Sequence, residues 1–573
     1  MSELARIGVL VVATSLNWWG ENDPGAPRWD LILRGGRIVD GTGNPWFEAD
    51  VAIRGDRIAA VGQLGPRETA ARVVDARGLV VAPGFIDIHS HSDMTLLEDG
   101  AALSKVLQGV TTEVLGEGES AGPAQGKRSP RSWKTASGRA EWTTLGEYFA
   151  LLQKQGIAPN VASYVGLGTL LGCVLGEALV RPDAAALGEM KRLLAEALDQ
   201  GALGLSCMLA SPRELPVTTD DLVELCGVVR ERGGSFSTHI RNEGTEVLEA
   251  VREAIAVAER ARVPVEIIHL KIADQSLWGR MGEIVSLIDQ ARRRGVDVQA
   301  NVYPYTRGNN DLVSIIPPWA HEGGRAELLR RLKDPLIRQR LKTEIQTGVP
   351  GWYNHYTAVG GDWSRMLISA RLSPSNQRFQ GQTMDQVIAA RSRDDTRPVD
   401  PFDVLFDLLA EEGGSVGAIF AHHAESDMTL ALAQPWCSVG SDGVALAVTG
   451  PLRQGHPHPR SFGTFPRVLG VYVRDRGLLR LEEAVRKMTS MNAAKIGLHD
   501  RGLIRPGMAA DLTVFDPAEV IDQATYLEPF AYAQGIQAVV VNGQLVVSGG
   551  APTHARPGQV LRRSRTTDVQ PSP

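Results

Sequence analysis

The chain has 573 residues, of which 43% are hydrophobic and 22% charged, a balance typical of globular proteins. Sixty Lys and Arg side chains against 66 Asp and Glu give a net charge of −6, which argues against a nucleic acid as the main partner. No apolar run reaches the roughly 18 residues of a membrane-spanning helix. The four cysteines fit neither a disulfide framework nor a zinc ribbon, so we expect a cytoplasmic protein with no membrane partner.

The two ends of the chain differ from its middle in their hydrophobic pattern. Residues 1–28 contain a short apolar run without a clear cleavage site, so we interpret them as a flexible extension rather than an export signal. Short period-two runs separated by Gly, Asp and Asn predict hairpins in 29–82, and the same texture returns in 500–560 with the turn signal Asn542-Gly543. We predict one small β-sandwich domain built from both segments. The polar tail 561–573 is expected to be disordered.

Residues 83–499 alternate apolar runs with amphipathic helical patterns, the sequence form of repeated β/α units. Nine runs qualify as strands: 85–88, 110–115, 161–165, 203–207, 236–239, 265–270, 296–303, 416–420 and 438–440. We predict an α/β fold with a (β/α)₈ barrel of the TIM type, in which one of the nine is an extra strand or a buried loop. The weakly periodic stretch 309–400 is interpreted as an insertion, and insertions in barrels usually lie over the active site.

Histidines occur where predicted strands end. His89 and His91 are two residues apart, so their side chains project the same way from one strand, at the barrel edge that carries active sites. Two imidazoles on a rigid strand suit a divalent transition metal, zinc first, although a pair of structural histidines would give the same pattern. His239, His269 and Asp442 also close predicted strands. Their shared position predicts a metal site at the barrel mouth.

Over about residues 30–550 the chain resembles the amidohydrolase superfamily, and within it the N-acyl-D-amino-acid deacylase (D-aminoacylase) family. The His-x-His pair marks the superfamily, and the segments His456–Arg460 and Gly463–Arg467 point to the deacylase branch. The resemblance implies a metal-dependent hydrolase barrel with one or two zinc ions per subunit, and N-acyl-D-amino acids as substrates.

The resemblance also implies a role for each strand-end residue. His89 and His91 would hold one metal, and His239 and His269 would hold the other position. Asp442 would contact the metal-bound water, take its proton as a general base as hydroxide attacks the carbonyl, and return that proton to the leaving amine.

Substrate contacts follow from the same resemblance. Tyr303 would hydrogen-bond the developing oxyanion, unless it and Tyr305 only pack the barrel rim. Arg460 would hold the substrate α-carboxylate, a task suited to a planar bidentate donor, unless it forms a surface salt bridge. Lys271 would assist with that carboxylate. His422 and His423 end another apolar run and are candidates for lining the pocket or supporting the metal.

One turn departs from the family pattern. Relatives place a bridging cysteine in a Gly-Asn-Cys-Gly turn, where this chain has Gly116-Glu117-Gly118-Glu119. The bridging lysine of many superfamily members is also missing from the fourth strand. Because a carboxylate can bridge or ligate zinc, we expect Glu117 or Glu119 to take this role, with Cys207 as a weaker alternative. If none of them binds, the site holds a single metal.

These features predict a zinc-dependent enzyme that hydrolyses a linear amide in a small-molecule substrate. The same site would serve another amide, a cyclic amide or an aminated ring. Outside the enzymes, the alternative is a non-catalytic assembly protein of this fold, against which the full set of five strand-end residues argues. The motifs do not specify the acyl chain or the amino-acid side chain of the substrate. They are compatible with a homo-oligomer.

Overall fold

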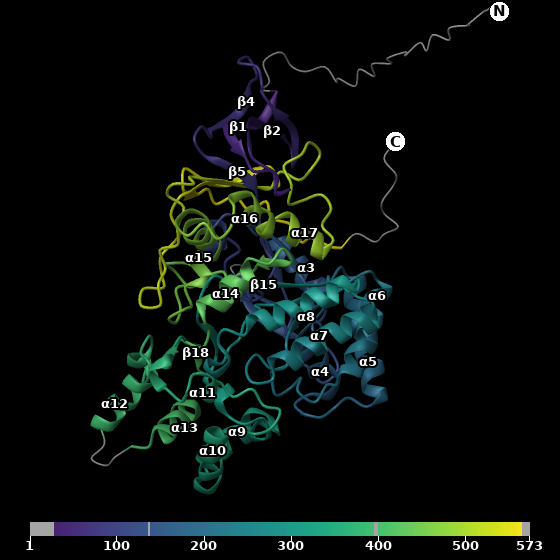
Figure 1. Ribbon diagram of the computed structural model, residues 1–573. Helices are drawn as coiled ribbons and strands as arrows, with labels where there is room; N and C mark the ends of the chain where they lie inside the picture. Colours follow the sequence, from purple (N-terminus) through teal and green to yellow (C-terminus); the bar gives the residue numbers. More distant parts are fainter. Residues whose placement is uncertain (1–27, 136–137, 395–398, 564–573) are drawn as a thin grey trace, which may run out of the picture.

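The computed structural model describes residues 28–135, 138–394 and 399–563 (Figure 1). Apart from Arg28 and residues 561–563, the predicted extension and tail lie outside the described residues. Leu561 is 8% exposed and donates its N–H to the Val161 carbonyl oxygen, so ordered structure continues past the expected start of the tail. Within the described ranges, no helix combines the length and the hydrophobicity needed to cross a lipid bilayer.

Strands from both ends of the chain form a single sheet, which caps the molecule at the top of Figure 1. Among the described residues its strands are β1 (Trp29–Ile38), β2 (Phe47–Arg54), β3 (Arg57–Gly62), β4 (Ala70–Asp75), β5 (Val80–Pro83), β20 (Leu512–Phe515), β21 (Ile536–Val541), β22 (Gln544–Ser548) and β23 (Ala551–Pro552). The two halves join where β5 pairs antiparallel with β20, with Val81 opposite Val514. Both valines are fully buried, so apolar burial ties the chain ends together.

The middle of the chain contains a run of parallel strands in sequence order. They are β6 (Phe85–Asp87), β7 (Val110–Leu115), β10 (Asn160–Ser163) with its continuation β11 (Val165–Gly166), β12 (Gly204–Met208), β13 (Ser235–His239), β14 (Val265–Ile267), β15 (Val298–Val302) and β19 (Cys437–Val439). Neighbouring strands pair in parallel, and a parallel bridge between Ser90 and Gly443 brings the first strand to the last. This is the predicted TIM-type barrel.

Amphipathic helices pack outside these strands (Figure 1). The main ones are α3 (Leu145–Gln155), α4 (Leu167–Leu175), α5 (Ala184–Asp199), α6 (Thr219–Glu231), α7 (Val247–Ala261), α8 (Met281–Arg293), α14 (Glu425–Leu432), α16 (Leu481–Met488) and α17 (Ser490–Ile496). In α7, the buried residues Val247, Val251, Ala254 and Ala258 recur every three or four positions, which gives the helix one apolar face toward the barrel.

An insertion follows β15 and carries its own core, at the lower part of Figure 1. Its elements are β16 (Gly308–Asp311), α9 (Gly324–Lys333), α10 (Pro335–Thr347), α11 (His355–Ala358), β17 (Met366–Ile368), α12 (Met384–Asp394), α13 (Pro401–Glu411) and β18 (Gly417–Phe420). Of the nine predicted strands, 416–420 is the one that lies outside the barrel, because β18 pairs antiparallel with β16 and β17. A short buried apolar run has the same sequence pattern in either sheet.

Candidate metal centre

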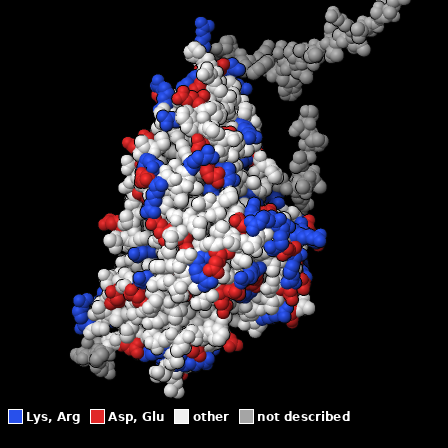
Figure 2. Space-filling model, viewed as in Figure 1, with Lys and Arg blue, Asp and Glu red and all other residues white. Residues whose placement is uncertain are grey.

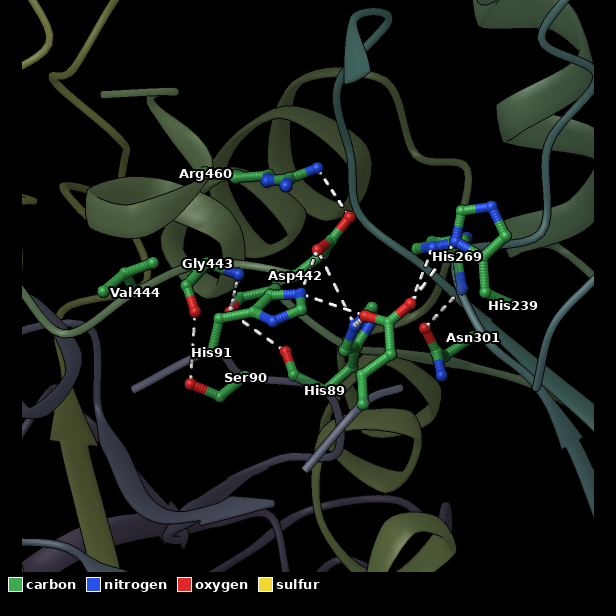
Figure 3. Close-up of polar contacts among 12 residues, drawn as sticks. His89, Ser90, His91, His239, His269, Asn301, Asp442, Gly443, Val444 and Arg460 are labelled. Atoms are coloured by element: carbon green, nitrogen blue, oxygen red, sulfur yellow. Dashed lines mark hydrogen bonds and ion pairs between the residues drawn. The ribbon is translucent and has the colours of Figure 1, made fainter. Parts of the chain in front are cut away.

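The predicted ligands converge at the carboxyl ends of the barrel strands (Figure 3). His89 and His91 follow β6, and Glu117 follows β7. His239 is the last residue of β13, His269 comes two residues after β14, and Asp442 lies three residues after β19. Parallel strands end at one edge of a barrel, so residues far apart in the chain meet there.

Glu117 lies between the imidazoles. Its Oε2 atom is 2.5 Å from His89 Nε2 and 3.0 Å from His91 Nε2. Its Oε1 atom is 3.3 Å from His239 Nδ1 and 3.7 Å from His269 Nε2. Two ligand groups therefore share this carboxylate, one formed with His89, His91 and Asp442 and the other with His239 and His269.

The donor chemistry of these groups fits zinc. Burial by itself would raise the pKa of Glu117, but the surrounding imidazoles hold it well below its ordinary value, so the carboxylate is an anion. Burial lowers the pKa of His89, which favours the neutral imidazole, whereas at His91 and His269 the neighbouring carboxylates outweigh burial and raise the pKa, to about 10 for His91, so that metal binding there would release a proton. Within each group the imidazole and carboxylate donors lie within 4.8 Å of one another, and all but His91 are buried, which matches the ligands that zinc takes in proteins.

Asp442 links this centre to Arg460. Its Oδ1 atom is 3.0 Å from His91 Nε2, and its Oδ2 atom is 2.6 Å from Arg460 Nη1 (Figure 3). Burial would raise the pKa of Asp442, but Arg460 and the imidazoles outweigh it and keep the carboxyl ionised. Arg460 is itself 4% exposed, so its contact with Asp442 is a buried ion pair and not a surface salt bridge.

Tyr303 lies beside Arg460, whose guanidinium carbon is 4.8 Å from the centre of the tyrosine ring. Its hydroxyl is buried and has no hydrogen-bond partner among the described residues. Burial raises the pKa of this hydroxyl well above its ordinary value, so it remains a proton donor. A donor without a partner at the edge of a ligand cavity is suited to hydrogen-bond a substrate oxygen.

Glu243 is a member of the centre that the sequence motifs did not single out. Its Oε1 atom is 3.1 Å from His269 Nδ1 and 2.5 Å from Lys271 Nζ, and its Oε2 atom is 3.6 Å from His239 Nε2. A carboxylate on the far nitrogen of a ligand histidine fixes the orientation of the ring. The available signal was its position four residues after His239.

Two of the candidate ligands have a left-handed backbone, with φ of 38° at His269 and 51° at Asp442. Such conformations are unfavourable for residues other than glycine and persist only where neighbouring contacts hold them. The His269 N–H donates to Asn301 Oδ1 at 2.9 Å, and the Asp442 N–H donates to the His89 carbonyl oxygen at 2.8 Å. Strain therefore collects at the strand ends that carry the ligands.

Three predicted residues lie elsewhere. Glu119 is an alternative that the structure does not support, because its carboxylate is 43% exposed and pairs with Arg128. Cys207 is buried and its thiol donates to Thr238 Oγ1, outside both ligand groups. The hydroxyl of Tyr305 is directed to Asp522 Oδ2 at 3.2 Å rather than to the cavity. In each case the local sequence predicts that the residue lies near the end of a strand, but it does not predict the direction in which the side chain points.

A cavity of about 300 Å³ opens over the centre. It is lined by the ligand cluster, Lys271, Tyr303 and Arg460, and on the opposite side by residues of the insertion. The insertion contributes Asn309 and Asn310 from β16, His355 from α11 and His422 from the segment after β18. Of these four residues, the sequence motifs indicate only His422.

A barrel with a buried imidazole and carboxylate cluster at its carboxyl edge defines a metal-dependent hydrolase. A model of the "Amidohydrolase family" matches residues 72–547, and the chain belongs to that family. The D-aminoacylase of Alcaligenes xylosoxydans xylosoxydans is 34% identical over 94% of this chain and 98% of its own length. The N-acyl-D-glutamate deacylase of the same organism is 35% identical, over 93% and 96%.

Solved structures agree with this membership. N-acyl-D-glutamate deacylase from Bordetella bronchiseptica, in complex with zinc and a phosphonate that mimics the tetrahedral intermediate, matches with a TM-score of 0.77. It is 33% identical, over 93% of this chain and 99% of that one. A D-aminoacylase structure, reported with a binuclear metal centre, matches with the same TM-score and 34% identity.

Proposed function

We propose that this protein is a zinc-dependent deacylase that hydrolyses N-acyl-D-amino acids. The observation that carries the proposal is the buried contact between Arg460 and Asp442, which places a guanidinium next to the candidate base. A substrate with a carboxylate one carbon from its amide nitrogen would satisfy both groups at once. The relatives named for D-amino-acid deacylation support the same substrate class.

The residues that would hold the metals are His89 and His91 at one position and His239 and His269 at the other, with Glu117 between them. Bound zinc would polarise the amide carbonyl and lower the pKa of water. The remaining steps are assigned to side chains of this chain.

Asp442 would accept a proton from the attacking water and then transfer it to the leaving amine. Its ionised state in the free protein depends on Arg460. When the substrate α-carboxylate binds Arg460, its negative charge would offset part of the guanidinium charge that lowers the pKa of Asp442. The pKa of Asp442 would then rise. Substrate binding would thus prepare the base.

Tyr303 would donate its hydrogen bond to the oxygen of the tetrahedral intermediate, where charge develops. Arg460, fixed by the short helix α15 (Arg460–Arg467), would orient the substrate through its carboxylate. The four cysteines are all buried and unpaired, which supports a reducing compartment such as the cytoplasm. A homo-oligomer is compatible with this scheme.

The test is to strip the metal, restore zinc, and assay amine release from N-acetyl amino acids in D and L forms. We expect zinc-dependent turnover of the D forms. Turnover of a hydantoin, a lactam or an aminated purine in their place would instead favour the cyclic-amide or deaminase alternative. Zinc binding with no turnover of any of these compounds would favour a non-catalytic assembly protein.

A further inference from the structure

The insertion gives the cavity a wall of neutral polar side chains. His355 Nε2 lies 3.0 Å from Asn310 Nδ2, and His422 lies 6.0 Å from His355 between ring centres. The wall is held in place by the insertion sheet, in which Asn309 pairs with Ile419 and Asn310 with Ala418. Asn310 Oδ1 accepts from the Asp311 N–H and Asn309 Oδ1 accepts from the Ser369 hydroxyl, so both carboxamides have fixed orientations.

Apolar contacts keep both histidines uncharged. His355 packs against Tyr353 and Phe420, with ring centres 4.4 and 5.1 Å apart, and His422 stacks on Phe420 at an interplanar angle of 8°. Burial lowers the pKa of His355 to about 3, and burial with the neighbouring His423 lowers the pKa of His422 well below its ordinary value. In its neutral form His355 accepts at Nε2 from Asn310 Nδ2 and so orients that carboxamide, while the Nδ1 atoms of His355 and His422 are buried without a partner among the described residues.

Among the described residues that line the cavity, only Lys271 and Arg460 are permanent cations. Lys271 Nζ is 2.5 Å from Glu243 and 2.7 Å from His269 Nδ1, so its charge is already matched. Arg460 is paired with Asp442 and, in the proposed function, also takes the α-carboxylate. A second carboxylate in the substrate would find no free cation on the insertion side, and burying an unpaired charge is costly.

The α-carboxylate site proposed at Arg460 adjoins this wall. The guanidinium carbon of Arg460 is 4.8 Å from the centre of the Tyr303 ring. The Tyr303 ring centre is 5.9 Å from that of His423, which in turn is 4.5 Å from that of His422. On the other side of the centre, Met208 lines both this cavity and a second one of about 300 Å³. Because the two halves of an amide leave its carbonyl carbon in different directions, binding at Arg460 would leave the Met208 side for the acyl half.

We propose that Asn309, Asn310, His355 and His422 form the subsite for the amino-acid side chain and select a neutral hydrogen-bonding side chain, such as a carboxamide, over an acidic one. This inference rests on the proposed deacylase function. It distinguishes this chain from its relatives named for D-glutamate and D-aspartate, which are as similar to it as the D-aminoacylase is.

The test compares N-acetyl-D-glutamine, N-acetyl-D-glutamate and N-acetyl-D-norleucine, which are similar in size. We expect kcat/KM for the glutamine compound to exceed that for the glutamate compound by at least about tenfold, with norleucine between them. Equal rates, or a preference for glutamate, would overturn the subsite while leaving the deacylase function intact. Failure on all three compounds and on every other acyl amino acid would overturn the deacylase function itself.

Variants separate recognition from folding. His355→Phe keeps the ring among its aromatic neighbours, and we expect it to lower kcat/KM for glutamine about tenfold while norleucine changes by less than about threefold. Tyr353→Phe is the matched control, because its hydroxyl binds the Ala273 carbonyl oxygen outside the cavity, and it should affect both compounds equally. Asn310→Arg should raise kcat/KM for glutamate. If it does not, Asn310 does not face the side chain and the subsite is wrong.

Discussion

Glu117 is the residue on which the two candidate metal positions depend. A thiolate offers one sulfur atom, whereas a carboxylate offers two oxygens, and here each oxygen faces a separate pair of imidazoles. A carboxylate in this turn therefore offers a donor atom to each of the two candidate positions. Glu119, two residues later, is directed to Arg128 and provides a comparison within the same turn.

Glu117→Gln should remove the shared anion and lower kcat/KM at least about 100-fold, because loss of a ligand costs no less than loss of a supporting contact. Bound zinc, measured by elemental analysis, should fall by at least one ion per chain. Glu119→Gln should keep its zinc and an activity within about twofold. Equal losses in the two variants would show that Glu119 takes part in the centre.

Arg460→Lys keeps the charge but removes the planar fork, and we expect kcat/KM for N-acetyl-D-amino acids to fall about 100-fold. The loss should be much smaller for an N-acetyl amine without the α-carboxylate, measured in the same assay. A similar loss with both compounds would mean that Arg460 acts through Asp442 rather than on the substrate.

At the scale of elements, the barrel strands place the ligands and the insertion shapes the cavity around them. The insertion has a separate apolar core, which includes Leu332, Phe406 and Phe420, and it meets the cavity through β16, α11 and the end of β18. The candidate metal ligands and the proposed side-chain subsite thus lie on different elements. Changes in one should leave the other largely unaffected.

Phe406→Ala opens a cavity in the insertion core and should cost about 3–5 kcal/mol locally. We expect a higher KM and faster proteolysis within 308–420, with zinc content unchanged. Exposed Leu336→Ala is the matched control and should change neither quantity. Loss of zinc from the Phe406 variant would contradict the separation of the two elements.

The start of α6 offers a prediction on pH. Asp221 completes a capping box with Thr218 and accepts two 3.0 Å hydrogen bonds from Arg181. Burial would raise the pKa of Asp221, but Arg181 and Thr218 outweigh it and lower it. A lowered pKa in the folded state stabilises the protein above the unfolded value of about 3.9, and this stabilisation is lost as the pH falls through the folded value.

Asp221→Asn should therefore lower the stability by about 1–2 kcal/mol at pH 7, and the difference from the parent should shrink as the pH falls below 4. Melting temperatures recorded across this range measure the effect. Asp220→Asn, at an exposed position in the same turn, should show a smaller change. A difference that stays constant with pH would show that the carboxylate charge is not the cause.

At the scale of the whole molecule, contacts between distant segments hold the fold together. The terminal sheet joins both chain ends through β5 and β20, and on the face drawn in Figure 2 basic and acidic side chains are interspersed over this part of the molecule. The ligand cluster links the ends of β6, β7, β13, β14 and β19. A metal bound there would tie together strands from most of the barrel.

Removing zinc should lower the melting temperature by at least about 5 °C, because a ligand that binds only the folded state stabilises it. Added zinc should restore the melting temperature, whereas magnesium, which prefers oxygen ligands, should not. The Glu117→Gln variant should show a smaller shift than the parent. An unchanged melting temperature in the metal-free parent would argue against a structural link through the cluster.

The sequence by itself determined the barrel, the shared sheet of the two ends and the strand-end histidines, because these depend on local periodicity and on residue types at fixed spacing. Tertiary structure alone decided that Glu117 rather than Glu119 faces the imidazoles, that Glu243 supports His269, and that 417–420 pairs within the insertion. It also decided that Asn310 and His355 meet the cavity. Side-chain direction and strand partners depend on contacts between residues far apart in the chain, which local patterns do not contain.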